Sequence, residues 1–324
     1  MPRDRSPQDS DHSLAIRAAW LHYIGGLTQS AVAKRLGVPS VKAHRLIARA
    51  VAEGAVKVSI DGDIIECIEL EAALSDRFGL EICRVAPDLG EDGLPLRTLG
   101  MAGAAMIRRW LESGEIATMG IGHGRTLAAA VRNLPRFEAR GLRFVSLLGG
   151  LTRNFSANPH DVMHLLAEKT GANAYVMPVP FFANSVEDRE VLLAQKGVAE
   201  VFQMAEAAPL KIVGIGTVDT ETQLVASGMI EQSEIEEIAR AGGIGEVLGH
   251  FFDSAGNRLE TTLTARTLSV AFREDRSDSI VALAGGGEKL GAIRAVLNSG
   301  WLSGLITDER TARALLSGKD RRPK

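Results

Sequence analysis

Residues 116–127 read IATMGIGHGRTL, and this stretch indicates the fold of most of the chain. An apolar, strand-like run ends in Gly122 and Gly124, and a helix is expected to begin near Arg125. Apolar strands that alternate with helices are typical of a parallel sheet covered on both faces. Apolar, strand-like runs recur at residues 142–150, 174–178, 212–216 and 280–287. A helix over 289–297 is expected after the last of them. The sequence therefore predicts a large α/β domain over residues 63–324.

The N-terminal part of the chain has a different pattern. Residues 28–50, TQSAVAKRLGVPSVKAHRLIARA, predict two short helices separated by a turn at Gly37, because glycine accepts such a turn without strain from a Cβ atom. Thr28 is a suitable N-cap for the first of them. The expected helices span residues 14–24, 29–36 and 40–53, followed by a short strand at 55–60 and a turn at 61–62. Three helices and a β wing are typical of a winged helix-turn-helix. Residues 14–62 are therefore predicted to form a DNA-binding domain, after a disordered tail over 1–13.

The second helix of such a pair enters the major groove of DNA. Arg45 has the geometry to donate two hydrogen bonds to a guanine edge, whereas Lys42 and Arg49 suit phosphates. The alternative is a helical hairpin used only for packing or dimerisation, but basic residues on the third helix favour DNA. The predicted DNA-contacting residues are Thr28, Gln29, Ser40, Lys42, His44, Arg45 and Arg49.

The charge distribution agrees with this division. Residues 1–62 carry nine Lys and Arg against five Asp and Glu, whereas the remainder carries an excess of seven acidic residues. A basic module joined to an acidic body suits a protein in which only the first part contacts DNA.

The glycine-ended strands point to a small-molecule site. Ligands of open parallel sheets bind at the carboxyl ends of the strands, and a helix N-terminus there presents N–H groups to an anion. Lys289 offers a point charge to a phosphate or hydroxyl, although it is alternatively a surface lysine at a helix start. The loop at 122–126 is alternatively an ordinary tight turn, and Asp253 is better explained as a cap or a solvated acid. The predicted effector-binding residues are Gly122, His123, Gly124, Arg125, Thr126, Arg153, Asn154, Glu246 and Lys289.

Several classes of protein are disfavoured. The 324 residues contain two cysteines, Cys67 and Cys83, without metal spacing, and no run of about 18 apolar residues that would suggest a membrane span. No hydrolase or metalloprotease motif is found, and His160 and His164 lack a third metal ligand. Phe181-Phe182 is expected to be a lid or a core aromatic pair and not a platform for a cofactor. We expect a cytoplasmic protein without cofactor, metal or catalytic residues.

Taken together, these residues resemble the SorC/DeoR-type family of sugar-binding transcriptional regulators over residues 14–316. The most specific stretch is residues 284–316, AGGGEKLGAIRAVLNSGWLSGLITDERTARALL, supported by GGIGEVLGHFFD at 242–253 and NPH at 158–160. The resemblance implies a ribose-phosphate-isomerase-like sheet domain that senses an effector, and dimers or tetramers that bind operator DNA. It also implies that the 122–126 loop and Lys289 hold a phosphate or terminal hydroxyl. His123 departs from the family, where Trp is frequent at this position.

The sequence thus predicts a repressor or activator of a carbohydrate or polyol catabolic operon, controlled by a sugar, polyol or sugar phosphate. The main rival is a sugar-phosphate isomerase or deaminase on the same sheet. A nucleotide-binding oxidoreductase is a weaker rival, because Glu138 stands in a poor context for binding a ribose.

Overall fold

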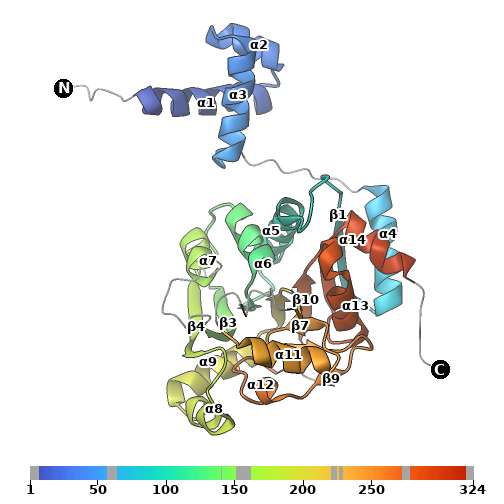
Figure 1. Ribbon diagram of the computed structural model, residues 1–324. Coiled ribbons are helices and arrows are strands. Elements are labelled where there is room, and N and C mark those ends of the chain that lie inside the picture. The colour runs from blue at the N-terminus through green and yellow to red at the C-terminus, as the bar shows by residue number, and fades with distance from the viewer. Residues whose placement is uncertain are drawn as a thin grey trace. The chain divides into compact units, whose positions relative to one another are not determined.

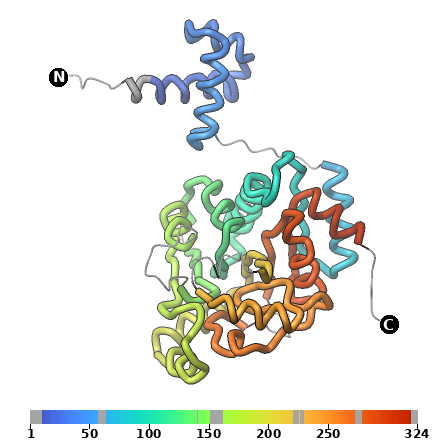
Figure 2. The backbone as a smooth tube through the Cα atoms, viewed as in Figure 1, coloured from blue at the N-terminus to red at the C-terminus, as the bar shows by residue number. Residues whose placement is uncertain are grey.

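The computed structural model describes residues 7–56, 64–139, 141–150, 162–219, 225, 229–271 and 278–318. The chain divides into two compact units, Met1–Gly62 and Asp63–Lys324, here termed the head and the body (Figures 1 and 2). Among the described residues, none of the helices combines the length and the apolar character that a membrane span requires.

The head contains three helices: α1 (Pro7–Tyr23), α2 (Gln29–Leu36) and α3 (Ser40–Ala52). The Thr28 hydroxyl accepts a hydrogen bond from the Ala31 backbone N–H at 3.2 Å and so caps α2. Gly37 ends α2 in the left-handed conformation, at φ 65°. Small and branched apolar side chains form the core of the head, namely Ala15, Ala18, Ala19, Val32, Ala33, Ala43, Leu46, Ile47 and Ala50. The predicted helices α2 and α3 are confirmed.

The disordered tail predicted for residues 1–13 is wrong from Pro7 onward, since α1 begins there. The reason is tertiary. His12 Nδ1 lies 2.8 Å from a carboxylate oxygen of Glu53, and Asp11 lies 4.0 Å from the Lys42 ammonium, so the start of α1 packs across α3. Such long-range contacts leave no periodic signal in the sequence. The strand and turn predicted at 55–62 fall mostly on residues 57–63, outside the described residues, so the wing stays a prediction.

A seven-stranded parallel sheet forms the centre of the body, which confirms the predicted α/β class. The strand order is β1-β11-β10-β5-β2-β3-β4. In that order the strands span Ile82–Ala86, Gly304–Asp308, Ser279–Leu283, Leu210–Val213, Thr118–Ile121, Arg143–Gly150 and Asn173–Pro180. From β2 the chain moves to β3 and β4 on one side and then returns to β5 on the other. The sheet therefore has a topological switch point between β2 and β5, where open α/β sheets bind ligands.

Two apolar layers cover the faces of this sheet. Met119, Ile121 and Phe144 point into one layer, against α5 (Leu96–Ser113), α6 (Arg125–Asn133) and α7 (Met163–Thr170). Val145 and Leu147 of the same β3 strand point into the other layer, as strand alternation requires. The helices of that second layer are α4 (Ile65–Phe78), α9 (Lys196–Glu206), α11 (Gln232–Arg240), α13 (Leu290–Asn298) and α14 (Glu309–Ser317).

A smaller antiparallel sheet with the strand order β6-β7-β8-β9 belongs to the body as well. Its strands are Gly216–Thr217, Gly245–Val247, His250–Phe252 and Arg258–Leu259. The short helices α8 (Val186–Leu193), α12 (Thr262–Ala265) and the 3-10 turn η1 (Gly287–Lys289) complete the described elements. This small sheet follows β5 directly, and it therefore brings β7 to the carboxyl ends of the large sheet.

Candidate functional site

The loop after β2 lies at the switch point of the sheet. The Gly122 N–H donates to the carbonyl oxygen of Ile212 in β5 at 2.8 Å. Gly124 has a φ of 125° and serves as the N-cap of α6, without a side-chain cap. The Thr126 hydroxyl donates to the carbonyl oxygen of Leu283 at the end of β10, at 2.9 Å. The loop thus joins three strand ends, and the N-terminus of α6 starts among them.

Glycines allow these strand ends to approach one another closely. A Cβ atom on Gly214, just after β5, would lie 3.1 Å from the carbonyl oxygen of His123. A Cβ atom on Gly122 would lie 3.2 Å from the Ile212 carbonyl oxygen. Both distances are tighter than ordinary van der Waals contact, so a side chain at either position would require its neighbour to shift by a few tenths of an ångström.

Lys289 follows β10, at the end of η1. Its ammonium donates to the carbonyl oxygen of Ile215, just after β5, at 2.5 Å. Burial lowers the pKa of Lys289, and the nearby Arg125 charge lowers it further, while Glu246 opposes the shift. A partly buried cation beside the switch point is suited to an anionic or hydroxyl-bearing ligand.

Glu246 in β7 is the acidic member of the site and is only 7% exposed. Its Oε1 accepts a hydrogen bond from the Gly249 N–H at 2.6 Å. Burial raises the pKa of Glu246, and the Gly249 hydrogen bond and the Lys289 charge oppose that rise. The site therefore pairs a cation with a desolvated carboxyl group.

The turn after Glu246 is strained. Leu248 has a φ of 52°, which a branched side chain rarely adopts. A Cβ atom on Gly122 would lie 3.4 Å from a Leu248 methyl carbon, so this turn packs on the end of β2. Strained backbone of this kind gathers at functional sites, where the surrounding structure holds it in place.

An aromatic wall borders the same loop. The rings of His123 and Phe181 meet edge to face, with centroids 5.9 Å apart. Phe181 is 1% exposed, and its ring centroid lies 4.2 Å from that of Phe182. Of the two interpretations left open for this pair, a core position is therefore the correct one. Sequence reasoning missed both Leu248 and the role of Phe181 beside His123.

The predicted effector-site residues that the structure describes therefore lie close together. The 122–126 loop, Glu246 and Lys289 lie at the ends of β2, β5 and β10 and in the adjoining β7. Arg153 and Asn154 fall within 151–161, outside the described residues. Asp253 is not part of the group, because its carboxylate accepts hydrogen bonds from Ala255 N and Asn257 N and so closes the turn after β8.

In the head, all seven predicted DNA-contacting residues are exposed. His44 Nδ1 lies 3.2 Å from the side-chain oxygen of Gln29, which joins α3 to the start of α2. Arg49 donates to Glu53 at 2.6 Å. Within the described part of the head, the Arg45 guanidinium makes no hydrogen bond or ion pair, so it is available to a base edge.

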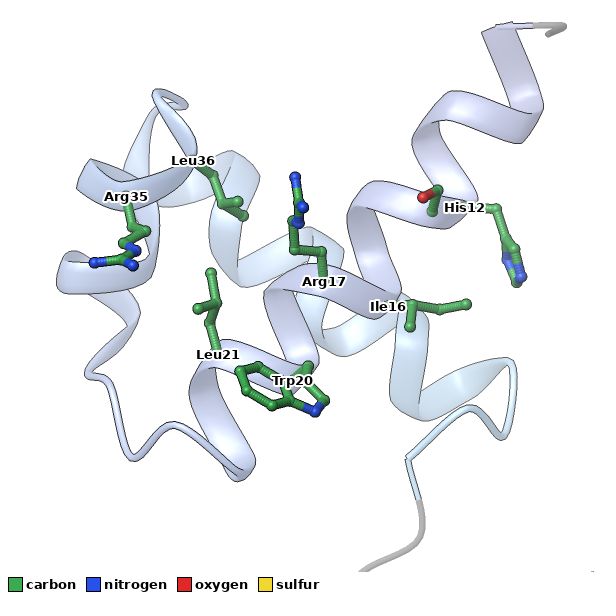
Figure 3. A pocket seen from close by; sticks show the side chains of 8 residues that line it. His12, Ile16, Arg17, Trp20, Leu21, Arg35 and Leu36 are labelled. Atoms are coloured by element: carbon green, nitrogen blue, oxygen red, sulfur yellow. The ribbon is translucent and has the colours of Figure 1, made fainter.

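The head also has a groove of about 680 Å³ between α1 and α2 (Figure 3). Ile16 and Trp20 border it with 44% and 60% of their surfaces exposed. Arg17 projects from the same helix, whereas Arg35 borders the groove from α2 (Figure 3). None of the residues that line it belongs to the predicted effector or DNA-contacting sets. This groove is therefore separate from the site in the body.

His250 in β8 makes the stability of the body depend on pH. Burial lowers its pKa to about 4, and its Nε2 lies 3.2 Å from the Val270 carbonyl oxygen. In the unfolded chain its pKa is about 6.5. The folded body holds His250 in its neutral form. The free energy of unfolding therefore keeps its full value above pH 6.5 and decreases as the pH falls from 6.5 toward 4. Between pH 7.5 and 5.5 we expect a loss of about 1 kcal/mol, measured by urea unfolding.

The His250 ring meets that of Trp301 edge to face, with centroids 6.0 Å apart, and His250→Phe should reduce this loss while keeping a ring there. His164→Ala, at an exposed histidine, is the matched control and should leave the pH dependence unchanged. An equal pH dependence in wild type and His250→Phe would contradict the assignment.

Comparison with known proteins relates 95% of the chain to transcriptional regulators. A family model described as "Putative sugar-binding domain" matches residues 62–317. The erythritol catabolism regulatory protein EryD of Brucella abortus is 68% identical over 308 residues, covering 95% of this chain and 98% of that protein. The transcriptional regulator LsrR of an Enterobacter strain is 32% identical over 314 residues, covering 95% and 94%. The full-length sorbitol operon regulator SorC from Klebsiella pneumoniae superimposes with a TM-score of 0.69 at 25% identity, covering 95% of this chain and all of that one.

Proposed function

Because this chain belongs to the SorC family of sugar-binding transcriptional regulators, we propose that it represses an operon for erythritol breakdown until a four-carbon polyol or its phosphate binds the body. The similarity to EryD supports the choice of polyol. The observation that carries the proposal is the meeting of the α6 N-terminus, Lys289 and Glu246 at the switch point of the sheet.

The chemistry of the site fits a short polyol. The N–H groups at the start of α6 and the Lys289 ammonium hold one terminal oxygen or a phosphate. Glu246 accepts hydrogen bonds from hydroxyl groups farther along the chain of the ligand. A second charged end would leave Glu246 facing an anion, so a ligand with one anionic end or none is favoured.

Arg153 and Asn154 are proposed as further contacts, because they follow β3, the neighbour of β2. Thr28, Gln29, Ser40, Lys42, His44, Arg45 and Arg49 are proposed as the operator-contacting set. In this proposal the protein acts in the cytoplasm as a dimer or tetramer, and it binds its effector without converting it. The relatives named above as transcriptional regulators support binding over turnover.

A thermal-shift series with the full-length protein tests the ligand. Erythritol, erythritol phosphate, ribitol, sorbitol and ribose 5-phosphate are compared at equal concentrations. A ligand at a hundred times its dissociation constant stabilises the folded state by about 2.7 kcal/mol, which raises Tm by roughly 5–10 °C. We expect this rise with the four-carbon compounds and a much smaller one with the others.

Comparison of erythritol with erythritol phosphate shows whether binding needs the phosphate. A rise with ribose 5-phosphate or sorbitol alone would reject the four-carbon polyol as the effector. Steady conversion of any of these compounds, followed by NMR, would favour the isomerase or deaminase instead.

A further inference from the structure

An apolar residue stands on the outer face of the proposed DNA-reading helix. Val41, in the first turn of α3, is 72% exposed. The buried face of this helix consists of Ala43, Leu46, Ile47 and Ala50. At 100° per residue, Val41 and Arg45 lie on the opposite side, one turn apart. Val41 therefore shares with Arg45 the face farthest from the core of the head.

Folding of the head gives no reason for valine at this position. Val38 and Val56 pack against the core of the head, but Val41 is not among the side chains that do so. β-branched residues lose side-chain freedom in a helix, so an exposed valine is a poorer helix former than alanine or lysine. Valine at position 41 therefore lowers the stability of the helix slightly and buries little apolar surface within the head.

The face that Val41 shares with Arg45 also has a small residue one turn farther on. Ala48 is exposed and follows Arg45 by three positions. A short side chain there lets the helix lie close to the floor of a groove. In the major groove, thymine alone presents a methyl group, and apolar side chains recognise it by contact.

We propose that Val41 contacts the C5-methyl group of a thymine within one or two base steps of the base edge read by Arg45. This inference rests on the proposed DNA-binding function of the head. It specifies one base of each half-site, and it makes Val41 a specificity-determining residue alongside the polar set.

The test first selects operator duplexes from a random pool with the full-length protein. Each thymine of the selected site is then replaced in turn by deoxyuridine, which removes only the C5-methyl group. Wild-type protein should bind about fourfold more weakly when the contacted methyl is absent from one half-site, and about sixteenfold more weakly when it is absent from both. Val41→Ala should bind the thymine and deoxyuridine duplexes with equal affinity at that position.

Two further variants make the result specific. Val41→Thr keeps one methyl group and should retain part of the sensitivity to deoxyuridine. Ile24→Ala removes an equally exposed apolar side chain, also 72% exposed, outside α3 and should respond to deoxyuridine as wild type does.

The outcomes separate the inference from the function on which it rests. A wild-type and a Val41→Ala protein with the same response to every deoxyuridine would overturn the thymine contact while leaving DNA binding intact. Failure to select any duplex would overturn both.

Discussion

Replacing Lys289 with alanine should abolish control by the effector while the protein still binds its operator. The ammonium lies at the end of η1 and donates to the Ile215 carbonyl oxygen, beside Glu246 and the start of α6. A hydrogen bond from a charged donor contributes about 1.5–3 kcal/mol when its partner is otherwise desolvated. The variant should therefore bind the effector roughly 10- to 100-fold more weakly, measured by calorimetry. In a gel-shift titration the effector should no longer release the operator at concentrations that release it from wild type.

The controls separate ligand contact from loss of folding. Lys169 is a comparable lysine, since its ammonium donates to the carbonyl oxygens of Arg132 and Leu134 at 2.8 and 2.6 Å. Lys169→Ala should lower Tm and keep the effector response. Lys289→Arg keeps the charge but changes its shape, so it should recover part of the affinity. A Lys289→Ala protein that responds at wild-type effector concentrations would place the pocket elsewhere.

Much of this site could be predicted from the sequence because its parts are local. The apolar run that ends in Gly122 and Gly124 predicted β2, the loop and the start of α6 within two residues. Since parallel strands end at one edge of a sheet, the glycines after β2, β5 and β10 had to come close together. Lys289 followed from the same argument, as the residue that ends the turn after β10.

The surroundings of Glu246 could not be predicted in this way. Strands of two or three residues, such as β6 and β7, are too short to show alternation. The desolvation of Glu246 and the strained backbone at Leu248 depend on how this small sheet packs on β2 and β5. β1 and β11 were missed as well, because neither ends in a glycine: β1 ends at Ala86, and β11 ends at Asp308, which caps α14.

The same distinction applies to the head. Capping chemistry at Thr28 and Gly37 located α2, whereas contacts between α1 and α3 fixed where α1 begins. Tertiary packing, which pairs residues 41 positions apart such as His12 and Glu53, extended the helix into a segment without apolar periodicity. Local rules therefore located the expected DNA-contacting residues but not the length of the helix that supports them.

Replacing Arg45 with alanine should remove sequence-specific binding of the operator. Arg45 lies on the side of α3 opposite the buried residues Leu46 and Ile47, and a guanidinium there reaches a guanine edge with two donors. One such contact is worth about 1–3 kcal/mol, or roughly 5- to 150-fold in affinity, for each half-site. The proposed dimer would lose the contact in both half-sites, so the affinity for the selected duplex should approach the affinity for an unrelated duplex in fluorescence anisotropy.

Lys42→Ala supplies the matched comparison, because it removes a positive charge from the same helix at a residue that we propose contacts a phosphate and not a base. It should lower the affinity for the specific duplex and for the unrelated duplex by similar factors. It should also reduce the slope of log affinity against log salt concentration by about one. Arg45→Ala should instead lower the ratio between the two duplexes. If Arg45→Ala lowered the affinity for both duplexes equally, the Arg45 side chain would contact a phosphate. Recognition of bases would then depend on other residues of this face. Because the Arg45 side chain has no partner within the described part of the head, its removal should leave Tm unchanged, and any loss of specificity is then a loss of contact with DNA.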